Sequence, residues 1–376
     1  PMLSDSSATQ AMHDARSNSQ SASRSWPVAD KRTTRVAIAV IATGTVVACT
    51  GSDDVDQPTA APEVYFRDVT EPAGLDFEHV NGASPRKYLP EIMGAGGSVL
   101  DYDGDGWMDL YLVQSGPLPG SEVELPPSEN RLYRNAGDGT FEDVTESADV
   151  GDTGYGMGSV AADYDNDGDP DIYVINYGRD VLYRNNGDGT FTDVSDASGI
   201  DGDSWGSSAA FFDADGDGHL DLYVVNYLQF SVAEHVDCGT PSKGIWSYCH
   251  PDVYDMEADT FYRSDGKGGF ADATEAAGLL DTSGNGKGLG VVVADLDGDG
   301  DPDIYVANDS TPNFLYRNQG DGTFEEIGLF SGTSHNDDGM TEAGMGTDAG
   351  DVNGDGKMDI IVTNLSAETN ALYLGG

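Results

Sequence analysis

The sequence predicts an all-β protein, a β-propeller built from four-stranded antiparallel blades. From residue 63 onward an acidic nonapeptide of the form D-x-[DN]-x-D-G-x-x-D recurs five times, and an apolar run rich in β-branched and aromatic residues follows each copy. A second unit, of the general form LYRNxGDGTFxDVT, recurs four times and carries the Asn/Asp-Gly signal of a tight hairpin. Each repeat is therefore predicted as strand, acidic loop, strand, connection, strand, tight turn and strand, which makes one propeller blade.

Three segments precede the repeats. Residues 1–30 form a Ser-rich extension of unassigned role, and residues 50–62 form an acidic linker without apolar periodicity. Between them, residues 31–49 have the proportions of a signal peptide, because basic residues precede a 13-residue, largely apolar run from Val36 to Ala48 that is too short to span a bilayer stably. The run ends in Val-Val-Ala-Cys at Cys49, which resembles the lipobox of bacterial lipoproteins, where the cysteine carries the lipid.

This N-terminal pattern predicts export. We expect the protein at the bacterial cell envelope or surface, lipid-anchored at Cys49, with this anchor as its only contact with the membrane. The alternatives are a plain signal peptide, which leads to secretion, and a buried strand.

The repeats occupy residues 63–376, and insertions lengthen two of them. One insertion is a proline-rich loop at 116–129, and the other spans residues 228–259 and contains two cysteines. Residues 66–70 match the fourth strand of a repeat but stand before the first acidic loop, whereas the last repeat stops after its third strand. We expect residues 66–70 to complete the last blade and to close the ring, since closure removes exposed sheet edges.

The acidic loops have the chemistry of calcium sites. A hard divalent cation takes six to eight oxygen ligands, and positions 1, 3, 5 and 9 of the loop supply side chains while position 7 supplies a backbone carbonyl. Glycine at position 6, present in all five copies, lets the chain turn around the ion. The predicted ligands, for about five Ca²⁺ ions, are Asp101, Asp103, Asp105, Trp107 and Asp109; Asp163, Asp165, Asp167, Asp169 and Asp171; Asp213, Asp215, Asp217, His219 and Asp221; Asp295, Asp297, Asp299, Asp301 and Asp303; and Asp351, Asn353, Asp355, Lys357 and Asp359.

Other interpretations of these loops are weaker. An EF-hand needs a glutamate at position 12 and flanking helices, and here position 12 is Leu or Val between strand-like runs. Magnesium keeps much of its water and rarely uses an all-protein cage. The remaining alternative is a set of solvated acidic turns. The fifth loop, with Asn353 at position 3, is expected to bind most weakly.

The two remaining cysteines lie in the second insertion. Export places the chain in an oxidising compartment, where Cys238 and Cys249, eleven positions apart, can form a disulfide.

Composition excludes one class of partner. Of 376 residues, 67 are acidic and 18 are basic, so the net charge of −49 repels nucleic acid. The histidines show no metal-ligand spacing and no hydrolase or nucleotide-binding fingerprint is present, so no catalytic residue is assigned. The ring of His219 is expected to face solvent. Four arginines recur in the third strand of a repeat and are expected to form structural ion pairs: Arg134, Arg184, Arg263 and Arg317.

Taken together, the motifs resemble the FG-GAP/VCBS repeats of integrin α-type propellers. The LYRNxGDGTFxDVT runs, residues 87–113 and the CGTPSKGIWSYCHPDVY insertion resemble, more narrowly, the bacterial ASPIC/UnbV-type relatives of cartilage acidic protein. This resemblance implies a seven-bladed propeller followed by a small C-terminal domain, so we expect either a ring that closes at five blades or an incomplete seven-bladed one. It also implies an interaction module for an unknown protein or glycan. The alternative is a calcium-dependent polysaccharide lyase or hydrolase on a propeller scaffold.

Overall fold

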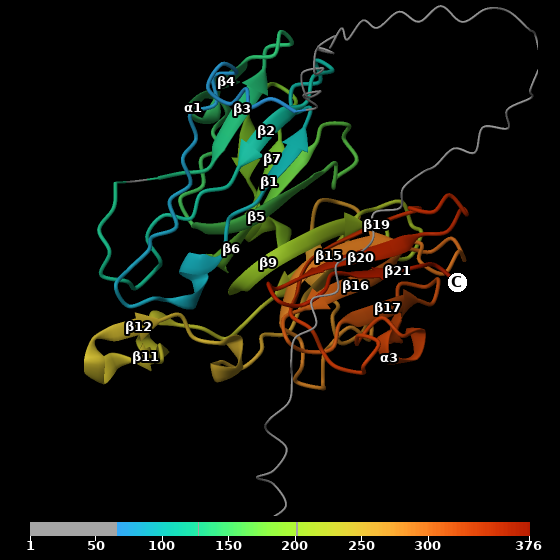
Figure 1. Cartoon of the computed structure of the whole chain (residues 1–376). Coiled ribbons are helices and arrows are strands. Elements are labelled where there is room, and N and C mark those ends of the chain that lie inside the picture. Colours follow the sequence, from blue (N-terminus) through green and yellow to red (C-terminus); the bar gives the residue numbers. More distant parts are fainter. Residues whose placement is uncertain (1–65, 127, 201) are drawn as a thin grey trace, which may run out of the picture. The chain divides into compact units, whose positions relative to one another are not determined.

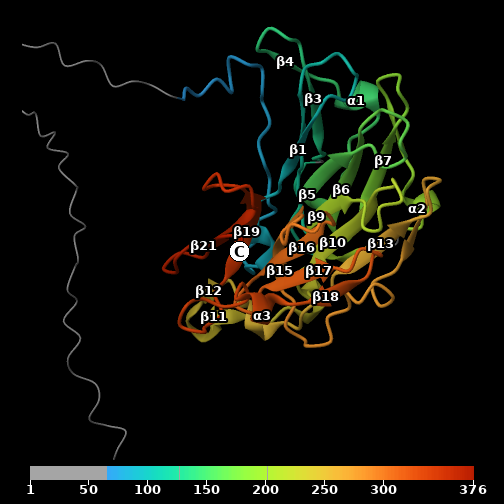
Figure 2. The ribbon, with the colours of Figure 1, turned by 90° about the vertical axis from the view of Figure 1, so that its right-hand side faces the viewer.

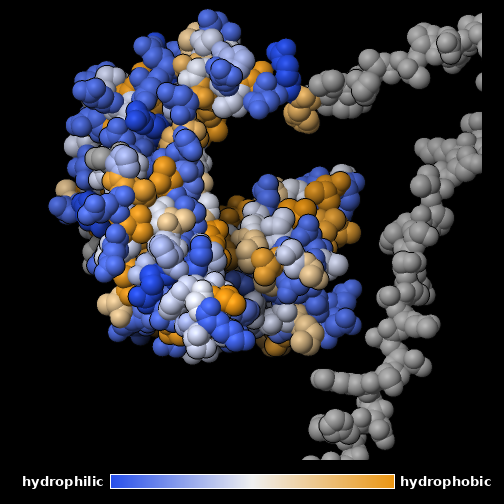
Figure 3. Space-filling model, turned by 60° about the vertical axis from the view of Figure 1, so that its left-hand side comes forward, coloured by the Kyte–Doolittle hydropathy of each residue, from blue (hydrophilic) through white to orange (hydrophobic). Residues whose placement is uncertain are grey.

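A computed structural model describes residues 66–126, 128–200 and 202–376 (Figure 1). The predicted extension, signal peptide and linker, including Cys49, lie outside the described residues. Within the described residues no helix combines the length and apolar character needed to cross a membrane. Hydrophilic residues predominate on the face shown in Figure 3, where hydrophobic residues form small patches.

The predicted order of elements is confirmed, with one group of antiparallel strands, here called a blade, for each acidic loop. The strands are, for blade 1, β1 (Gly97–Leu100), β2 (Asp109–Leu112), β3 (Arg131–Asn135) and β4 (Phe141–Asp143); for blade 2, β5 (Tyr155–Ala162), β6 (Asp171–Arg179), β7 (Val181–Asn185) and β8 (Phe191–Asp193); for blade 3, β9 (Asp203–Phe212), β10 (Asp221–Asn226), β13 (Thr260–Ser264) and β14 (Phe270–Asp272); for blade 4, β15 (Gly288–Ala294), β16 (Asp303–Asn308), β17 (Phe314–Asn318) and β18 (Phe324–Glu326); and for blade 5, β19 (Gly344–Gly350), β20 (Asp359–Asn364) and β21 (Ala371–Tyr373).

Helices are short, and the α-helical turns lie between blades, whereas the 3₁₀ turns Val232–Glu234, Pro241–Lys243 and Pro251–Val253 lie in the insertion of blade 3. Single turns of α-helix follow the fourth strand of blades 1, 2 and 4, as α1 (Thr145–Ala148), α2 (Ser195–Ser198) and α3 (Gly328–Ser331). A 3₁₀ turn, Leu89–Ile92, precedes β1. The first strands of successive blades lie next to one another in chain order, and the later strands of each blade extend away from them (Figure 2).

Each acidic loop joins the first and second strands of its blade at their paired ends. In blade 1, Leu100 pairs with Asp109, and in blade 2, Ala162 pairs with Asp171. Blades 2 and 3 are also joined directly, because β6 continues past its blade and pairs with the start of β9, at Tyr177 and Trp205.

The hydrophobic core lies between neighbouring blades. Side chains of the second strands are covered on both faces, so Ile172 and Val174 pack toward blade 1 with Tyr111, while Tyr173 packs on the other side with blade 3. The same alternation recurs along β16, where Ile304 packs toward blade 3 and Tyr305 toward blade 5. This arrangement explains the continuous apolar runs that follow the acidic loops.

The predicted closure of the ring is wrong. Residues 66–70 form no strand, Phe66 is 94% exposed, and β19–β21 remain a three-stranded sheet within the described residues. The N-terminal segment instead turns back on itself, since the N–H of Ala73 donates to the carbonyl of Val69 (2.8 Å) and that of Leu75 to Thr70 (3.1 Å). Ala73 then accepts the N–H of Phe141 (2.7 Å), which places the segment against blade 1.

The cysteine-containing insertion is a small two-stranded unit, β11 (Cys238–Thr240) and β12 (Ile245–Ser247). The sulfur atoms of Cys238 and Cys249 are bonded, 2.06 Å apart. The imidazole of His235 anchors the insertion, because it packs edge-on against Tyr88, with ring centroids 4.7 Å apart.

Candidate metal centres

The turn of each acidic loop depends on the glycine at position 6. This residue has positive φ in all five loops, from 88° to 101°, as the sequence predicts. No atom lies within 4 Å of a Cβ built on Gly106 or its equivalents, so the backbone conformation, and not lack of space, demands glycine there.

The aspartate at position 1 holds the turn in shape. In the first loop the two carboxylate oxygens of Asp101 accept the N–H groups of Asp105 (3.1 Å) and Gly106 (2.9 Å). Asp163 and Asp213 accept the equivalent pairs in the second and third loops. The loop is thus folded around one carboxylate before any ligand is considered.

The aspartate at position 9 connects the loop to the rest of its blade. Asp109 is fully buried; one oxygen accepts the N–H of Tyr102 inside the loop (3.1 Å) and the other accepts the N–H of Asn135 in β3 (2.7 Å). The same two bonds recur at Asp171, Asp221, Asp303 and Asp359.

Burial changes the ionisation of these ninth-position groups. It raises the pKa of Asp171 to about 8 and the pKa of Asp221 and Asp303 to about 6, while the main-chain hydrogen bonds lower it. A bound cation would favour the ionised form of each.

The structure brings the predicted carboxylates together in four of the five loops. In each, oxygen atoms of three aspartates lie within 4.8 Å of one another. In the first two loops these come from positions 1, 3 and 9, and in the next two from positions 1, 3 and 5. Within the described residues the fifth loop, with Asn353 at position 3, forms no group of this kind.

The second loop contains a buried carboxylate oxygen without a hydrogen-bond partner among the described residues. This oxygen is Oδ1 of Asp165. Burial also raises the pKa of Asp165, as does the negative charge of Asp167. A buried carboxylate oxygen without a donor is costly, and the carboxylate oxygens that converge at this turn are the kind of ligand that a hard divalent cation prefers. The residues present therefore fit a Ca²⁺-type ion.

Side chains at position 7 pack on the tight turn between the third and fourth strands. A Cβ on Gly137 would lie 2.8 Å from the indole nitrogen of Trp107, and one on Gly266 would lie 2.7 Å from Nε2 of His219. The imidazole of His219 packs on this turn with Nδ1 3.2 Å from Nδ2 of Asn166, so the ring expected to face solvent is only partly exposed.

Three of the recurring arginines form the expected ion pairs. Arg134 pairs with Glu142 (3.1 Å) and Arg317 with Glu325 (2.7 Å), each across a strand pair. Arg263 instead reaches into the third acidic loop, where it pairs with Asp215. The guanidinium of Arg263 thus neutralises the Asp215 carboxylate, which would otherwise be free to bind a cation.

A second repeated polar position was not predicted from the sequence. The residue directly before the third strand is Asn or Asp in every blade, and its side chain accepts an N–H from the end of the second strand. In blades 2 and 3 this residue is Asp180 or Asp259, which also accepts the hydroxyl of Tyr173 (2.5 Å) or Tyr223 (2.7 Å). Burial raises the pKa of both aspartates to about 7. The recurrence of Asn or Asp at this one position of every repeat is the sequence signal that could have identified it.

The family model for FG-GAP-like repeats matches residues 101–174, 163–224, 249–306 and 295–362. The chain belongs to the FG-GAP-like repeat family. Three of these matches begin at the first aspartate of an acidic loop, at Asp101, Asp163 and Asp295.

Curated relatives match a short part of the chain. Cartilage acidic protein 1 of Xenopus tropicalis is 42% identical over 62 residues, 16% of this chain and 9% of that protein. The human protein of that name is 39% identical over 72 residues, 19% of this chain and 10% of that protein. The matched region thus spans about a tenth of the length of these relatives.

Two solved structures show distant likeness. One is an Agrocybe aegerita lectin, studied for specific recognition of non-reducing terminal N-acetylglucosamine, with 19% identity, coverage of 71% of this chain and 60% of that chain, and a TM-score of 0.37. The other is the V. cholerae biofilm matrix protein Bap1, with 14% identity, coverage of 72% and 35%, and a TM-score of 0.36. These values are too low for an argument about ligand or function.

Proposed function

We propose that this protein is an exported, lipid-anchored interaction module whose FG-GAP blades are stabilised by calcium and whose surface binds a protein or glycan. The observation that supports calcium binding is the convergence of three aspartates within 4.8 Å in four successive loops. Export and anchoring are supported by the basic and apolar sequence of residues 31–49.

The role of the ion follows from the hydrogen bonds of its ligands. The position 1 aspartate holds the turn between the first and second strands, and the position 9 aspartate is bonded to the third strand. A cation shared by these carboxylates would connect three strands of one blade and neutralise their mutual repulsion. Calcium is therefore proposed as a structural ion, and the partner binds elsewhere.

The first prediction concerns removal of calcium. A ligand specific to the folded state adds RT ln(1 + [L]/Kd), about 2.7 kcal/mol per site at a hundredfold excess over Kd, so several sites together approach a domain's whole stability of about 5–15 kcal/mol. EGTA should lower the melting temperature by roughly ten degrees or more, and calcium should restore it better than magnesium does.

Variants show whether the loops cause this effect. Asp165→Asn should reduce the calcium-dependent shift in melting temperature, whereas Glu146→Gln, which removes one exposed negative charge in α1, should not. If the melting curves in EGTA and in millimolar calcium superimpose, the acidic loops are solvated turns and the calcium proposal fails.

The second prediction concerns the anchor. The mature protein should sediment with membranes, and Cys49→Ala should release it, because the lipidated cysteine is the proposed attachment. Equal partitioning of both forms would contradict lipid anchoring while leaving the calcium proposal intact.

A further inference from the structure

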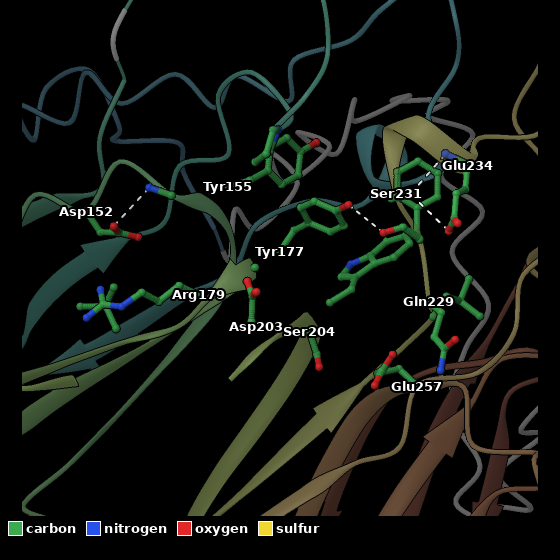
Figure 4. Close-up of a pocket in the computed structure, with 17 residues that line it drawn as sticks. Asp152, Tyr155, Tyr177, Arg179, Asp203, Ser204, Gln229, Ser231, Glu234 and Glu257 are labelled. Atoms are coloured by element: carbon green, nitrogen blue, oxygen red, sulfur yellow. Dashed lines mark hydrogen bonds between the residues drawn. The ribbon is translucent and has the colours of Figure 1, made fainter. Parts of the chain in front are cut away.

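A cleft with a volume of about 700 Å³ lies between blades 2 and 3, within the size range of small-molecule sites. Its walls come from the start of β5, the end of β6, the start of β9 and residues 228–231 after β10 (Figure 4). Because Tyr155 and Tyr177 pair at the end of β5 and β6 remote from the acidic loop, the cleft and the second metal centre occupy opposite ends of the same strands.

One part of the wall is an interlocked set of aromatic rings. Tyr177 contacts Tyr155, Trp205 and Phe230 edge-to-face, with ring centroids 6.0 to 6.2 Å apart. The hydroxyl of Tyr177 donates to the carbonyl of Phe230 (2.8 Å), which holds the loop after β10 against β6. Tyr177 and Phe230 are only half-buried, so they offer apolar surface to a ligand in a fixed orientation.

Polar groups along the cleft lack partners within the described residues. Trp205 is 2% exposed, and its indole N–H has no acceptor. A buried donor of this kind costs about 1–3 kcal/mol. Asp203, Ser204, Gln229 and Glu257 also line the cleft (Figure 4), and their side chains form no hydrogen bond with any described residue.

The uncompensated charge of the cleft is negative. Arg179 is the basic residue of its wall, and its guanidinium is held by Asp196 (2.9 Å) and Asp193 (3.6 Å). Asp203 and Glu257 have no ion-pair partner in the described part of the chain, and burial raises the pKa of Glu257. A positively charged group in the cleft would be attracted by these carboxylates.

We propose that this cleft binds an amino sugar, a saccharide that carries a protonated amino group. The carboxylates of Asp203 and Glu257 attract the ammonium group, Tyr177 and Phe230 contact the apolar face of the sugar ring, and Ser204 and Gln229 bond its hydroxyl groups. This inference rests on the proposed interaction function and names its ligand class, but it does not depend on calcium.

Calorimetric titration of the full protein tests the ligand class. The probe is a glucosamine oligosaccharide with free amino groups, compared with its fully N-acetylated counterpart of equal length and with an oligolysine peptide of equal charge. We expect the free-amine sugar to bind, and both others to bind about tenfold more weakly or not at all, since each lacks either the charge or the sugar ring. Equal binding of the neutral sugar, preferential binding of the peptide, or no binding of the free-amine sugar would overturn the proposal.

Variants assign the binding to this cleft. Glu257→Gln and Asp203→Asn should each weaken binding of the free-amine sugar about tenfold, whereas Glu146→Gln on blade 1 should leave it unchanged. The melting temperature of each variant in calcium shows whether it folds, so a folding defect is distinguished from loss of the ligand site. The melting temperature in EGTA tests the calcium proposal separately. Unchanged affinity in both cleft variants, with normal melting, would show that the sugar binds elsewhere.

Discussion

At the scale of single residues, aspartates of one sequence motif perform different tasks. Asp101 shapes the turn through two main-chain hydrogen bonds, whereas Asp109, eight residues later, is fully buried and bonded to the third strand. Asp215 in the third loop is paired with Arg263, so this loop offers one fewer free carboxylate than its sequence indicates. We therefore expect the third and fifth loops to bind calcium more weakly than the other three.

The third prediction concerns the two aspartates that precede a third strand. Burial raises the pKa of Asp180 and Asp259 to about 7 from about 3.8 in the unfolded chain, so the folded state binds their protons more tightly. This contribution to stability is fully present below pH 4 and is lost as the pH rises to about 7. Asp180→Asn and Asp259→Asn, which install the residue found in the other blades, should remove that loss.

The measurement is the free energy of unfolding against pH in saturating calcium, which keeps the loop carboxylates bound. The wild-type value should fall between pH 4 and 7 by an amount on the order of a few kcal/mol for each site, and the double variant should fall less. An identical pH dependence in both proteins would mean that folding does not raise the pKa of these aspartates.

At the scale of elements, the acidic loop and the turn between the third and fourth strands form one packed unit in blades 1 to 4. The side chain at position 7 of the loop lies on a glycine of that turn, as Trp107 does on Gly137. The acidic nonapeptide and the LYRNxGDGTFxDVT unit therefore recur together, because the loop of the first packs on the turn of the second.

The fourth prediction compares two glycines of one turn. Gly266 and Gly268 both have positive φ, 65° and 86°, so alanine at either position incurs about 1–2 kcal/mol of backbone strain. A Cβ on Gly266 would also lie 2.7 Å from the imidazole of His219, whereas on Gly268 the nearest atom is 3.9 Å away. Gly266→Ala should therefore destabilise the protein more than Gly268→Ala in chemical denaturation, and equal losses would contradict the packed unit.

At the scale of the whole molecule, stability comes from blades that cover one another. The second strands of blades 2 to 4 are buried on both faces, because each lies between two neighbours. In blade 5, Ile360 and Val362 face blade 4 and are buried, but Ile361 between them is 44% exposed. Equivalent apolar side chains of the second strands therefore contribute different amounts to the free energy of unfolding, depending on whether a neighbouring blade covers them.

The fifth prediction uses this difference. Ile304→Ala in β16 removes a fully buried side chain between blades 3 and 4 and should cost about 2–5 kcal/mol of unfolding free energy. Ile361→Ala, the same change at the exposed face of blade 5, should cost about 1 kcal/mol or less. Similar losses for the two variants would indicate that another surface covers Ile361 in solution.

The sequence by itself determined the repeat, the order of strands within a blade, the glycine turns and the positions of the acidic side chains in each loop. These features are local: nine residues contain the carboxylates, the glycine with positive φ and the start of the next strand, so their pattern can be read without knowledge of the rest of the chain. The regular recurrence of the nonapeptide then identified them as blades.

Tertiary structure alone decided the features that depend on distant segments. Residues 66–70 have the sequence of a strand, but a strand needs an edge to pair with, and hydrogen bonds within residues 69–75 and to Phe141 use the segment's main-chain groups instead. Three other features likewise require contacts between distant parts of the chain, which no local pattern relates. They are the pairing of β6 with β9, the packing of His219 on Gly266, and the cleft formed by residues from Pro119 to Glu257. Burial, which sets the pKa of Asp180 and Asp259, is a property of those contacts and could not be derived from residue type alone.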